Sequence, residues 1–223
     1  MQKLDEIFNY LENNLKNKVY LVGGSTRDYL LKRNFNDFDF ATVLTPNDIK
    51  KTFPDADYSF EKFGIVNLKY QNNFITLATF RKESNYVDSR HPQKIEFVTD
   101  LLTDSYRRDF TINSIYLDSS YNISDPQNGL PDLKNKIIRM IGDPEIRLKE
   151  DPLRILRAYR FSYLLNFTIE KHLQEVISNN FSLLHKIKIE KINMELNKLD
   201  RNNKDKLIYL LKKEEYFNGK FNL

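Results

Sequence analysis

Two neighbouring stretches organise this chain: Leu21-Val22-Gly23-Gly24-Ser25-Thr26-Arg27-Asp28 and Asn36-Asp37-Phe38-Asp39-Phe40. The first stretch is typical of a strand end, a double-glycine turn and the start of a helix. Glycines let the backbone come close to a bound group, and the free amides at a helix start suit a phosphate. Arg27 follows one turn later and can fork onto phosphate oxygens. We therefore interpret this stretch as a candidate phosphate cradle.

The second stretch alternates acidic and apolar side chains along a predicted strand. Because residues two apart in a strand share a face, Asp37 and Asp39 point one way, and Phe38 and Phe40 point into a core. Two carboxylates beside a phosphate cradle indicate a Mg²⁺ site for phosphoryl or nucleotidyl transfer. Each stretch alone has a plain alternative, a tight turn and a solvated strand face. Their order within about a dozen residues favours the functional interpretation.

Composition limits the classes of protein to consider. The chain has 223 residues, of which 40% are hydrophobic, enough for one large or two small globular domains. It has no cysteine, which excludes disulfides and thiolate chemistry and suits a cytoplasmic protein. No apolar run approaches about 20 residues, so we expect no membrane span.

The charge of the chain is uneven. The net charge is +4, and residues 182–223 hold ten Lys and Arg against six Asp and Glu, whereas residues 1–181 are balanced. A basic C-terminal region favours a polyanionic partner such as RNA. The alternative is a lysine-rich surface without a specific partner.

The predicted elements indicate an α+β fold, with helices and a small mixed sheet in residues 1–140 and an all-helical region in residues 141–223. An amphipathic helix is expected at 3–16, a strand at 19–22, a helix at 25–32 and the acidic strand at 34–42. A helix at 46–52 has Thr45 as a plausible N-cap. Further strands are expected at 63–70, 73–81 and 94–98. The polar residues Lys82–Gln93 lack periodicity and predict a mobile loop, either functional or a plain surface excursion.

Arginines at two other places could contact an anion. Arg107 and Arg108 enter an apolar stretch, where they either pair with nearby acids or face an anionic ligand. Further on, Asp151 suits the N-cap of a helix and is followed at steps of three by Arg154, Arg157 and Arg160. Arginines on a largely apolar helix are costly unless they meet anions, and a triphosphate would supply them. The alternative is an exposed helix with a capping ion pair.

Together these motifs resemble the bacterial CCA-adding tRNA nucleotidyltransferase family, which shares its head with bacterial poly(A) polymerases. Four patterns of that family occur here in the family's order, over roughly residues 18–200. They are Gly-Gly-x-x-Arg-Asp with Asp-x-Asp (Gly23 to Asp39), Arg-Arg-Asp-Phe-Thr-x-Asn (Arg107 to Asn113), Glu-Asp-x-x-Arg (Glu150 to Arg154) and a weaker echo of Glu-Arg-Ile-x-x-Glu (Glu190 to Glu195), in which Lys191 replaces the arginine.

The resemblance implies template-independent addition of C and A, from CTP and ATP, to the 3′ end of tRNA. Asp37 and Asp39 are then the catalytic ligands of Mg²⁺. The remaining candidates bind the nucleotide: Gly23, Gly24 and Arg27 at the triphosphate, Arg108, Asp109 and Asn113 near ribose and phosphates, Asp151 and Arg154 at the base edge, and Arg157 and Arg160 at phosphates. The basic C-terminal region is the expected contact for RNA.

Two departures from the family pattern keep alternatives open. Thr76 stands where a third acid is common, and only about 80 residues follow the head, so the resemblance implies a C-terminally short member, by nature or by shortening. CC-adding, A-adding or poly(A) polymerase activity is one alternative. A non-catalytic paralogue that binds RNA or nucleotides is another. An apparently full-length 82–93 segment speaks against a CC-only enzyme, because the family's CC-adders shorten it.

Overall fold

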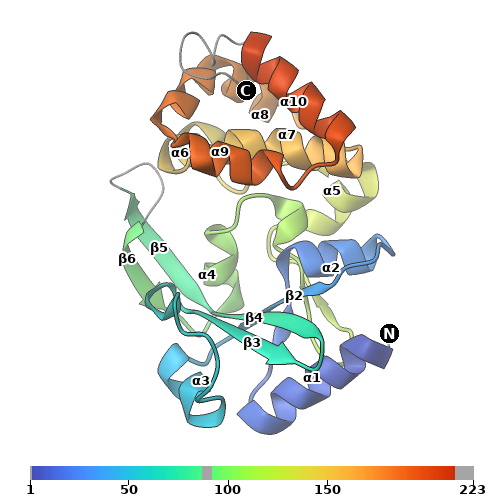
Figure 1. The fold of residues 1–223 in the computed structure, drawn as a ribbon, viewed down its shortest axis with the longest axis vertical. Helices are drawn as coiled ribbons and strands as arrows, with labels where there is room; N and C mark the ends of the chain where they lie inside the picture. Colours follow the sequence, from blue (N-terminus) through green and yellow to red (C-terminus); the bar gives the residue numbers. More distant parts are fainter. Residues whose placement is uncertain (1, 87–91, 214–223) are drawn as a thin grey trace. The chain divides into compact units, whose positions relative to one another are not determined.

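A six-stranded mixed sheet frames the first part of the chain in a computed structural model that describes residues 2–86 and 92–213 (Figure 1). The strand order is β3-β4-β2-β1-β7-β8, where β2 (Asp37–Thr42) runs parallel to β4 (Asn73–Thr79) and every other pairing is antiparallel. The other strands are β1 (Tyr20–Leu21), β3 (Ile65–Tyr70), β7 (Tyr116–Leu117) and β8 (Ile123–Ser124). The predicted α+β class with a small mixed sheet is confirmed.

The chain divides into two compact units. The first unit contains the residues up to 84 and residues 94–133, and the second is built mainly from residues 134–213. None of the helices in the part of the chain that the structure describes is long and apolar enough to cross a membrane.

One face of the sheet is covered by the predicted amphipathic helix, α1 (Gln2–Leu15), and by α3 (Pro46–Thr52) (Figure 1). The buried side of α1 carries Leu4, Ile7, Phe8, Leu11 and Leu15, which pack with Phe38 and Phe40 of β2. Thr45 caps α3 with a capping box completed by Asp48, as predicted. This packing fixes the side of β2 on which Phe38 and Phe40 lie, and so leaves Asp37 and Asp39 on the other side.

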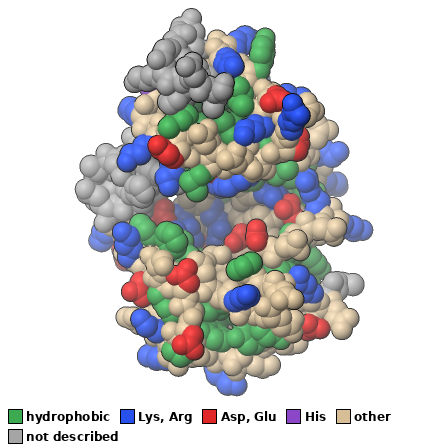
Figure 2. All heavy atoms as spheres, in the orientation of Figure 1, with side chains coloured by type: hydrophobic (Ala, Val, Ile, Leu, Met, Phe, Trp, Pro, Cys, Tyr) green, Lys and Arg blue, Asp and Glu red, His purple; other side chains and the backbone are tan. Residues whose placement is uncertain are grey.

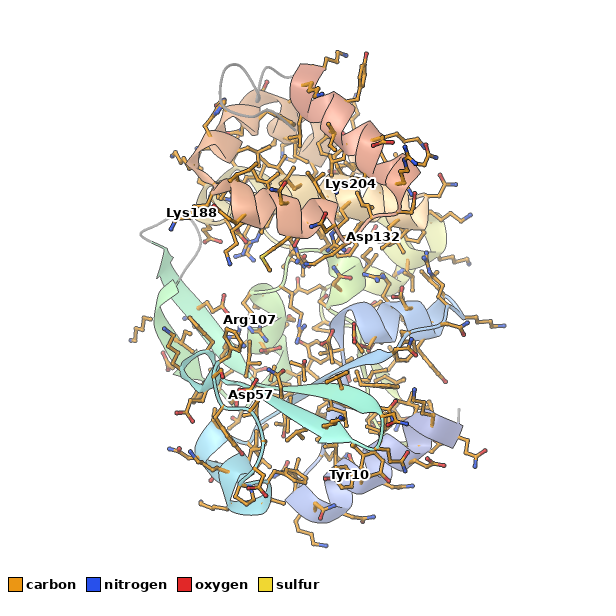
Figure 3. All side chains as sticks on the ribbon, viewed as in Figure 1. Tyr10, Asp57, Arg107, Asp132, Lys188 and Lys204 are labelled. Carbon is orange, nitrogen blue, oxygen red and sulfur yellow. The ribbon has the colours of Figure 1, made fainter. Side chains whose placement is uncertain are left out.

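Several short elements complete the first unit, the last of which continues two residues into the second unit. They are α2 (Gly23–Leu30), the 3₁₀ turns η1 (Glu61–Phe63) and η2 (Thr111–Asn113), α4 (Leu101–Tyr106) and α5 (Gly129–Asn135). The helix α2 begins at Gly23, two residues earlier than predicted. Asp132 of α5 accepts a hydrogen bond from the Thr111 hydroxyl at 2.7 Å, which anchors η2 to α5 (Figure 3).

The predicted loop at Lys82–Gln93 is wrong for its described residues. Residues 81–86 form β5 (Arg81–Tyr86), which pairs in a two-stranded sheet with β6 (Pro92–Phe97), and residues 87–91 lie outside the described part. The polar composition misled the prediction because strand pairing satisfies the backbone whether or not a face packs on a core.

The second unit is mainly helical. Its elements are α6 (Pro144–Glu150), α7 (Leu153–Leu165), α8 (Lys171–Asn180), η3 (Phe181–Lys186), α9 (Ile189–Leu196) and α10 (Arg201–Lys213), with α7 against α6, α9 and α10. The prediction that residues 141–223 are all helical is wrong in one place. β10 (Thr168–Ile169) pairs in parallel with β9 (Ile137–Ile138), after Asn166 ends α7 in the left-handed conformation. Burial of the Ile138 and Ile169 side chains stabilises this pairing.

Candidate active site

Asp37 and Asp39 lie on one face of β2, as the alternation predicted. Asp37 is exposed and Asp39 is half-buried, whereas Phe38 and Phe40 are buried on the opposite face. The two carboxylates are therefore held two residues apart on a strand whose other side is fixed in the core. A rigid strand of this kind keeps two acids close in spite of their mutual repulsion.

The glycine turn is joined to the acids by Ser25. The Ser25 hydroxyl donates to the Asp37 carbonyl at 2.9 Å and accepts from the Asp39 amide at 2.9 Å. The Val22 amide donates to the Asp39 carbonyl, also at 2.9 Å, immediately before the turn. Hydrogen bonds therefore join the start of α2 to the backbone of both Asp37 and Asp39.

Gly23 is required by this arrangement. Its φ of +71° lies in the left-handed region, where a side chain is disfavoured. A Cβ at Gly23 would lie 3.6 Å from Asp39 Oδ2 and 3.9 Å from Arg108 Nη1. The absent side chain therefore leaves open the space next to an acid and a guanidinium, where a bound phosphate could lie.

Arg27 is buried and its guanidinium is already engaged within the protein. It forks onto the neighbouring Asp28, with Nε 3.0 Å from Oδ1 and Nη2 2.9 Å from Oδ2. Its Nη1 donates to Asn113 Oδ1 at 2.8 Å, and Asn113 Nδ2 donates in turn to Asp109 Oδ1 at 3.0 Å. This chain brings three predicted residues together and ties α2 to η2. A Cβ at Gly24 would lie 3.6 Å from Arg27 Nη2, so this guanidinium lines the glycine turn.

Arg107 and Arg108 both pair with one buried acid, Asp104. Arg107 Nε lies 2.8 Å from Asp104 Oδ1 and Arg108 Nη2 lies 3.0 Å from Asp104 Oδ2. Tyr116 completes the cluster, because its hydroxyl donates to Asp104 at 2.7 Å and accepts from Arg108 Nε at 2.9 Å. The Arg108 guanidinium lies over the Tyr116 ring at 5.0 Å. The pairing with nearby acids is therefore real, and it holds Arg108 beside Gly23.

The electrostatics of the acid pair favour a bound cation. Burial raises the pKa of Asp39 and the negative charge of Asp37 adds to the rise, whereas Arg108 and Arg27 oppose it. Among the described residues there is no group of three or more His, Cys, Asp or Glu side chains arranged to hold a metal. Two carboxylates nevertheless fit Mg²⁺, which commonly binds through one or two acids and completes its shell with water and substrate phosphates.

In the second unit, Asp151 and Arg154 lie at the start of α7, but the N-cap is Pro152 and not Asp151 as predicted. Asp151 Oδ1 accepts from the Leu153 amide at 3.1 Å, which starts the helix. Arg154 Nη1 donates to the Arg147 carbonyl at 2.7 Å and to Glu150 Oε2 at 3.1 Å. Glu150 Oε2 also lies 2.5 Å from Arg147 Nη1. The buried Arg154 guanidinium is therefore held in one orientation by Glu150 and a backbone carbonyl.

The other two arginines of α7 differ from one another. Arg157 is half-buried, with its guanidinium 5.5 Å from the centre of the Phe161 ring. Arg160 is buried, 4.1 Å from the same ring centre, and its Nε lies 2.7 Å from Glu195 Oε2 of α9. Arg160 is therefore ion-paired, but it is buried and its partner lies on another helix, so the alternative of an exposed helix with a capping ion pair does not describe it. Its contact with a phosphate stays a prediction.

Sequence reasoning did not single out Ser25, Asp104 or Tyr116 as residues of the site. A signal existed for two of them, since Ser25 directly follows the glycines and Asp104 precedes Arg107 and Arg108 by three and four residues on a helix. Tyr116 is brought in from β7 by the sheet, and its local sequence carries no such signal.

Comparison with known sequences relates this chain to one family model and to curated enzymes. The family model of the poly A polymerase head domain matches residues 19–139. A CCA-adding enzyme of Staphylococcus epidermidis is 40% identical over 182 residues, which are 82% of this chain and 46% of that protein. One of Staphylococcus haemolyticus is 43% identical over the same shares of the two chains. This chain spans about half the length of the curated relatives it matches.

Comparison with solved structures agrees with the comparison of sequences. The crystal structure of Bacillus stearothermophilus CCA-adding enzyme in complex with CTP has a TM-score of 0.77 at 34% identity, covering 87% of this chain and 47% of that one. A tRNA nucleotidyltransferase complexed with a primer tRNA and an incoming ATP analog has a TM-score of 0.74 at 27% identity, covering 97% of this chain and 64% of the other. The resemblance predicted from the motifs is confirmed.

Proposed function

Because this chain belongs to the poly A polymerase head domain family, we propose that it adds nucleotides without a template to the 3′ end of RNA. More specifically, we propose that it adds C and A from CTP and ATP to tRNA, as the names of its relatives and the ligands of their structures support. A catalytic head domain is assigned to residues 1–140. A neck domain, which recognises the nucleotide base and contacts RNA, is assigned to residues 141–223. We propose the cytoplasm as the compartment, which the cysteine-free composition suits.

The observation that carries this proposal is the placement of Asp37 and Asp39. Ser25 bonds the backbone of both acids to the first turn of α2, and Arg108 lies beside Gly23 and Asp39. In our proposal, the two carboxylates hold Mg²⁺. When bound, the cation activates the attacking hydroxyl and neutralises charge that develops on the phosphate.

The surrounding residues provide for the triphosphate. The open space at Gly23 and Gly24 lets phosphate oxygens approach the amides at the start of α2, and Arg27 and Arg108 supply positive charge there. Asp109 and Asn113 act on Arg27, because the Asn113 carbonyl oxygen accepts from its Nη1 and Asp109 orients Asn113. These residues therefore position a charge that could compensate the anionic substrate.

Base choice is assigned to Asp151 and Arg154 in this proposal. A carboxylate accepts from the exocyclic amine that cytosine and adenine both carry, and a guanidinium donates to their ring nitrogens. Glu150 supports this assignment, since it holds the Arg154 head in place at 3.1 Å. Arg157 and Arg160 are assigned to phosphates, with Arg157 the less buried of the two.

RNA contact is assigned to the basic C-terminal region. Helix α10 exposes Tyr209, at 70% of its full accessibility, with Lys206 one turn before it and Lys213 one turn after it. Figure 2 shows Lys and Arg side chains on this side of the second unit. An exposed ring among lysines suits RNA, because a base stacks on the ring and the lysines meet its phosphates.

The test is incorporation of labelled nucleotides into a tRNA transcript that ends before CCA, with Mg²⁺ and each NTP alone and then CTP with ATP. The proposal expects C addition from CTP alone and completion to CCA only when ATP is added. The variant Asp39→Asn should abolish transfer, and Asp55→Asn, at an exposed acid of the same unit, should not. C addition without A identifies a CC-adding enzyme, and A addition to the unextended transcript identifies a poly(A) polymerase. A addition only to a second transcript that already ends in CC identifies an A-adding enzyme. No incorporation into either transcript under any condition rejects a catalytic function for this chain.

A further inference from the structure

Four polar residues form a row across the face of the sheet that carries the acids. Asp39 of β2 is paired with Thr76 of β4, and Thr76 is paired with Asn67 of β3. Asn67 in turn exchanges two backbone hydrogen bonds with Asp57, which lies beside the β3 edge (Figure 3). Residues directly opposite each other on neighbouring strands project to the same face, at a strand spacing of about 4.8 Å. The row therefore connects an exposed acid at the sheet edge to the site of Asp39.

Hydrogen bonds run along this row. The Thr76 hydroxyl lies 3.2 Å from Asn67 Oδ1, and Asn67 Nδ2 lies 3.4 Å from Asp57 Oδ2. Their direction is fixed by Asp57, because a carboxylate only accepts. Asn67 must give its amide hydrogens to Asp57, which turns its carbonyl oxygen to Thr76. The Thr76 hydroxyl must therefore be the donor towards Asn67.

This direction determines what Thr76 offers to the acid site. A hydroxyl has one hydrogen, and here that hydrogen points to Asn67, away from β2. Only lone pairs remain on the Thr76 oxygen for a group above the sheet. The Asp39 carboxylate next to it is also an acceptor, so a group between the two must be a donor or a cation. The threonine supplies this acceptor without a third negative charge beside Asp37 and Asp39.

We propose that Thr76 is a positioning residue that accepts a hydrogen bond from a water molecule of the cation held by Asp37 and Asp39, and that Asn67 and Asp57 fix its orientation. The inference rests on the proposed function, since it needs a divalent cation at the two acids. It suits Mg²⁺, which keeps several of its waters when it binds to protein carboxylates. Groups that orient the ligands of a metal commonly change its affinity 10- to 100-fold when they are lost.

The test measures metal affinity directly, by titrating the protein with Mn²⁺ and following free Mn²⁺ by electron paramagnetic resonance. Thr76→Val removes the hydroxyl, keeps the shape and should weaken Mn²⁺ binding about tenfold. Thr76→Ser restores the hydroxyl and should restore the parent affinity. Asp57→Asn frees Asn67 to turn over and should weaken binding by up to about fivefold. Thr168→Val, the same change at an exposed strand position of the second unit, is the matched control.

Asp39→Asn separates failure of this inference from failure of the proposed function. If Asp39→Asn weakens Mn²⁺ binding and Thr76→Val does not, the acids bind the metal and the role of Thr76 is wrong. If Asp39→Asn leaves Mn²⁺ binding unchanged, the metal site of the proposed function is itself wrong. A Thr76→Ser protein that binds as weakly as Thr76→Val would show that packing, and not the hydroxyl, matters at this position. Circular dichroism of each variant establishes that it is folded.

Discussion

Arg160 Nε lies 2.7 Å from Glu195 Oε2, in an ion pair whose side chains are only 8% and 4% exposed. Lys198 Nζ adds a second contact, 2.7 Å from Glu195 Oε1. Removing one partner of a buried pair leaves the other charge uncompensated and costs about 3–5 kcal/mol. We therefore expect Glu195→Gln to lower the free energy of unfolding by about that amount in urea denaturation. Glu190→Gln, at an exposed position of the same helix, is the matched control and should cost little.

The same ion pair predicts a dependence of stability on pH. Burial favours the neutral acid, but Arg160, Arg157 and Lys198 outweigh it and lower the pKa of Glu195 below its ordinary value of 4.5. A depressed folded-state pKa adds stability that is fully present above the unfolded-state pKa and is lost as the pH falls through the folded value. The difference in stability between the parent and Glu195→Gln should thus be constant near neutral pH and shrink below about pH 4.5. A difference that grew on acidification would contradict the assignment.

The hydrogen bonds between Ser25 and the strand of the acids lead to a prediction about the rate of nucleotide transfer. Its hydroxyl is the only side-chain group shown to bond the backbone of both Asp37 and Asp39 in the described residues. Ser25→Ala removes both bonds, costs about 1–3 kcal/mol of stability and lets the carboxylates move relative to α2. We expect a marked fall in the rate of nucleotide transfer, measured by single turnover, with little change in tRNA affinity. Ser178→Ala, which removes a single bond to the backbone of α8, should leave the transfer rate unchanged.

Tyr116 allows the role of Arg108 to be measured without removing a charge. Tyr116→Phe deletes the hydroxyl between Arg108 and Asp104 but keeps the ring under the guanidinium. Arg108 then has fewer restraints, so CTP and ATP should bind more weakly in fluorescence titrations, with a stability loss of about 1–2 kcal/mol. Tyr58→Phe also loses a hydroxyl bonded to a backbone carbonyl, in the same unit, and is the control. Equal loss of nucleotide affinity in both variants would show a general effect of stability.

The sequence correctly predicted the features that depend on residues close together in the chain. The faces of α1, the capping box at Thr45 and the alternation of Asp37 to Phe40 follow from spacing alone, and the structure has them. The sites of the arginines on α7 also followed from spacing. Their partners did not, because Glu195 lies 35 residues after Arg160 and only the packing of α9 on α7 brings them together.

Pairing between strands that lie far apart in the sequence was the second reason why parts of the fold were predicted wrongly. The pair β9 and β10 joins residues about 30 apart, and β5 has a polar sequence that its pairing with β6 makes regular. The row from Asp39 to Asp57 shows the same limit in the site. Thr76 was recognisable as a departure from the family pattern, but its hydrogen-bonded partners depend on the register of three strands.

The selection of bases is the prediction most particular to the motifs of the second unit. Asp151 and Arg154 are one helical turn apart, and Glu150 holds the Arg154 head at 3.1 Å. Uracil and guanine would place a carbonyl oxygen against the Asp151 carboxylate, and two facing acceptors leave a desolvated group unpaired at about 1–3 kcal/mol or more. Asp151→Ala should therefore lose discrimination against UTP and GTP and also slow the use of CTP and ATP. Arg157→Ala is the matched comparison on the same helix, and it should weaken all four nucleotides about equally because a phosphate contact carries no base information. The measurement is the incorporation efficiency of the four NTPs with each protein. An Asp151→Ala protein that excluded UTP and GTP as well as the parent does would place base selection elsewhere in the chain.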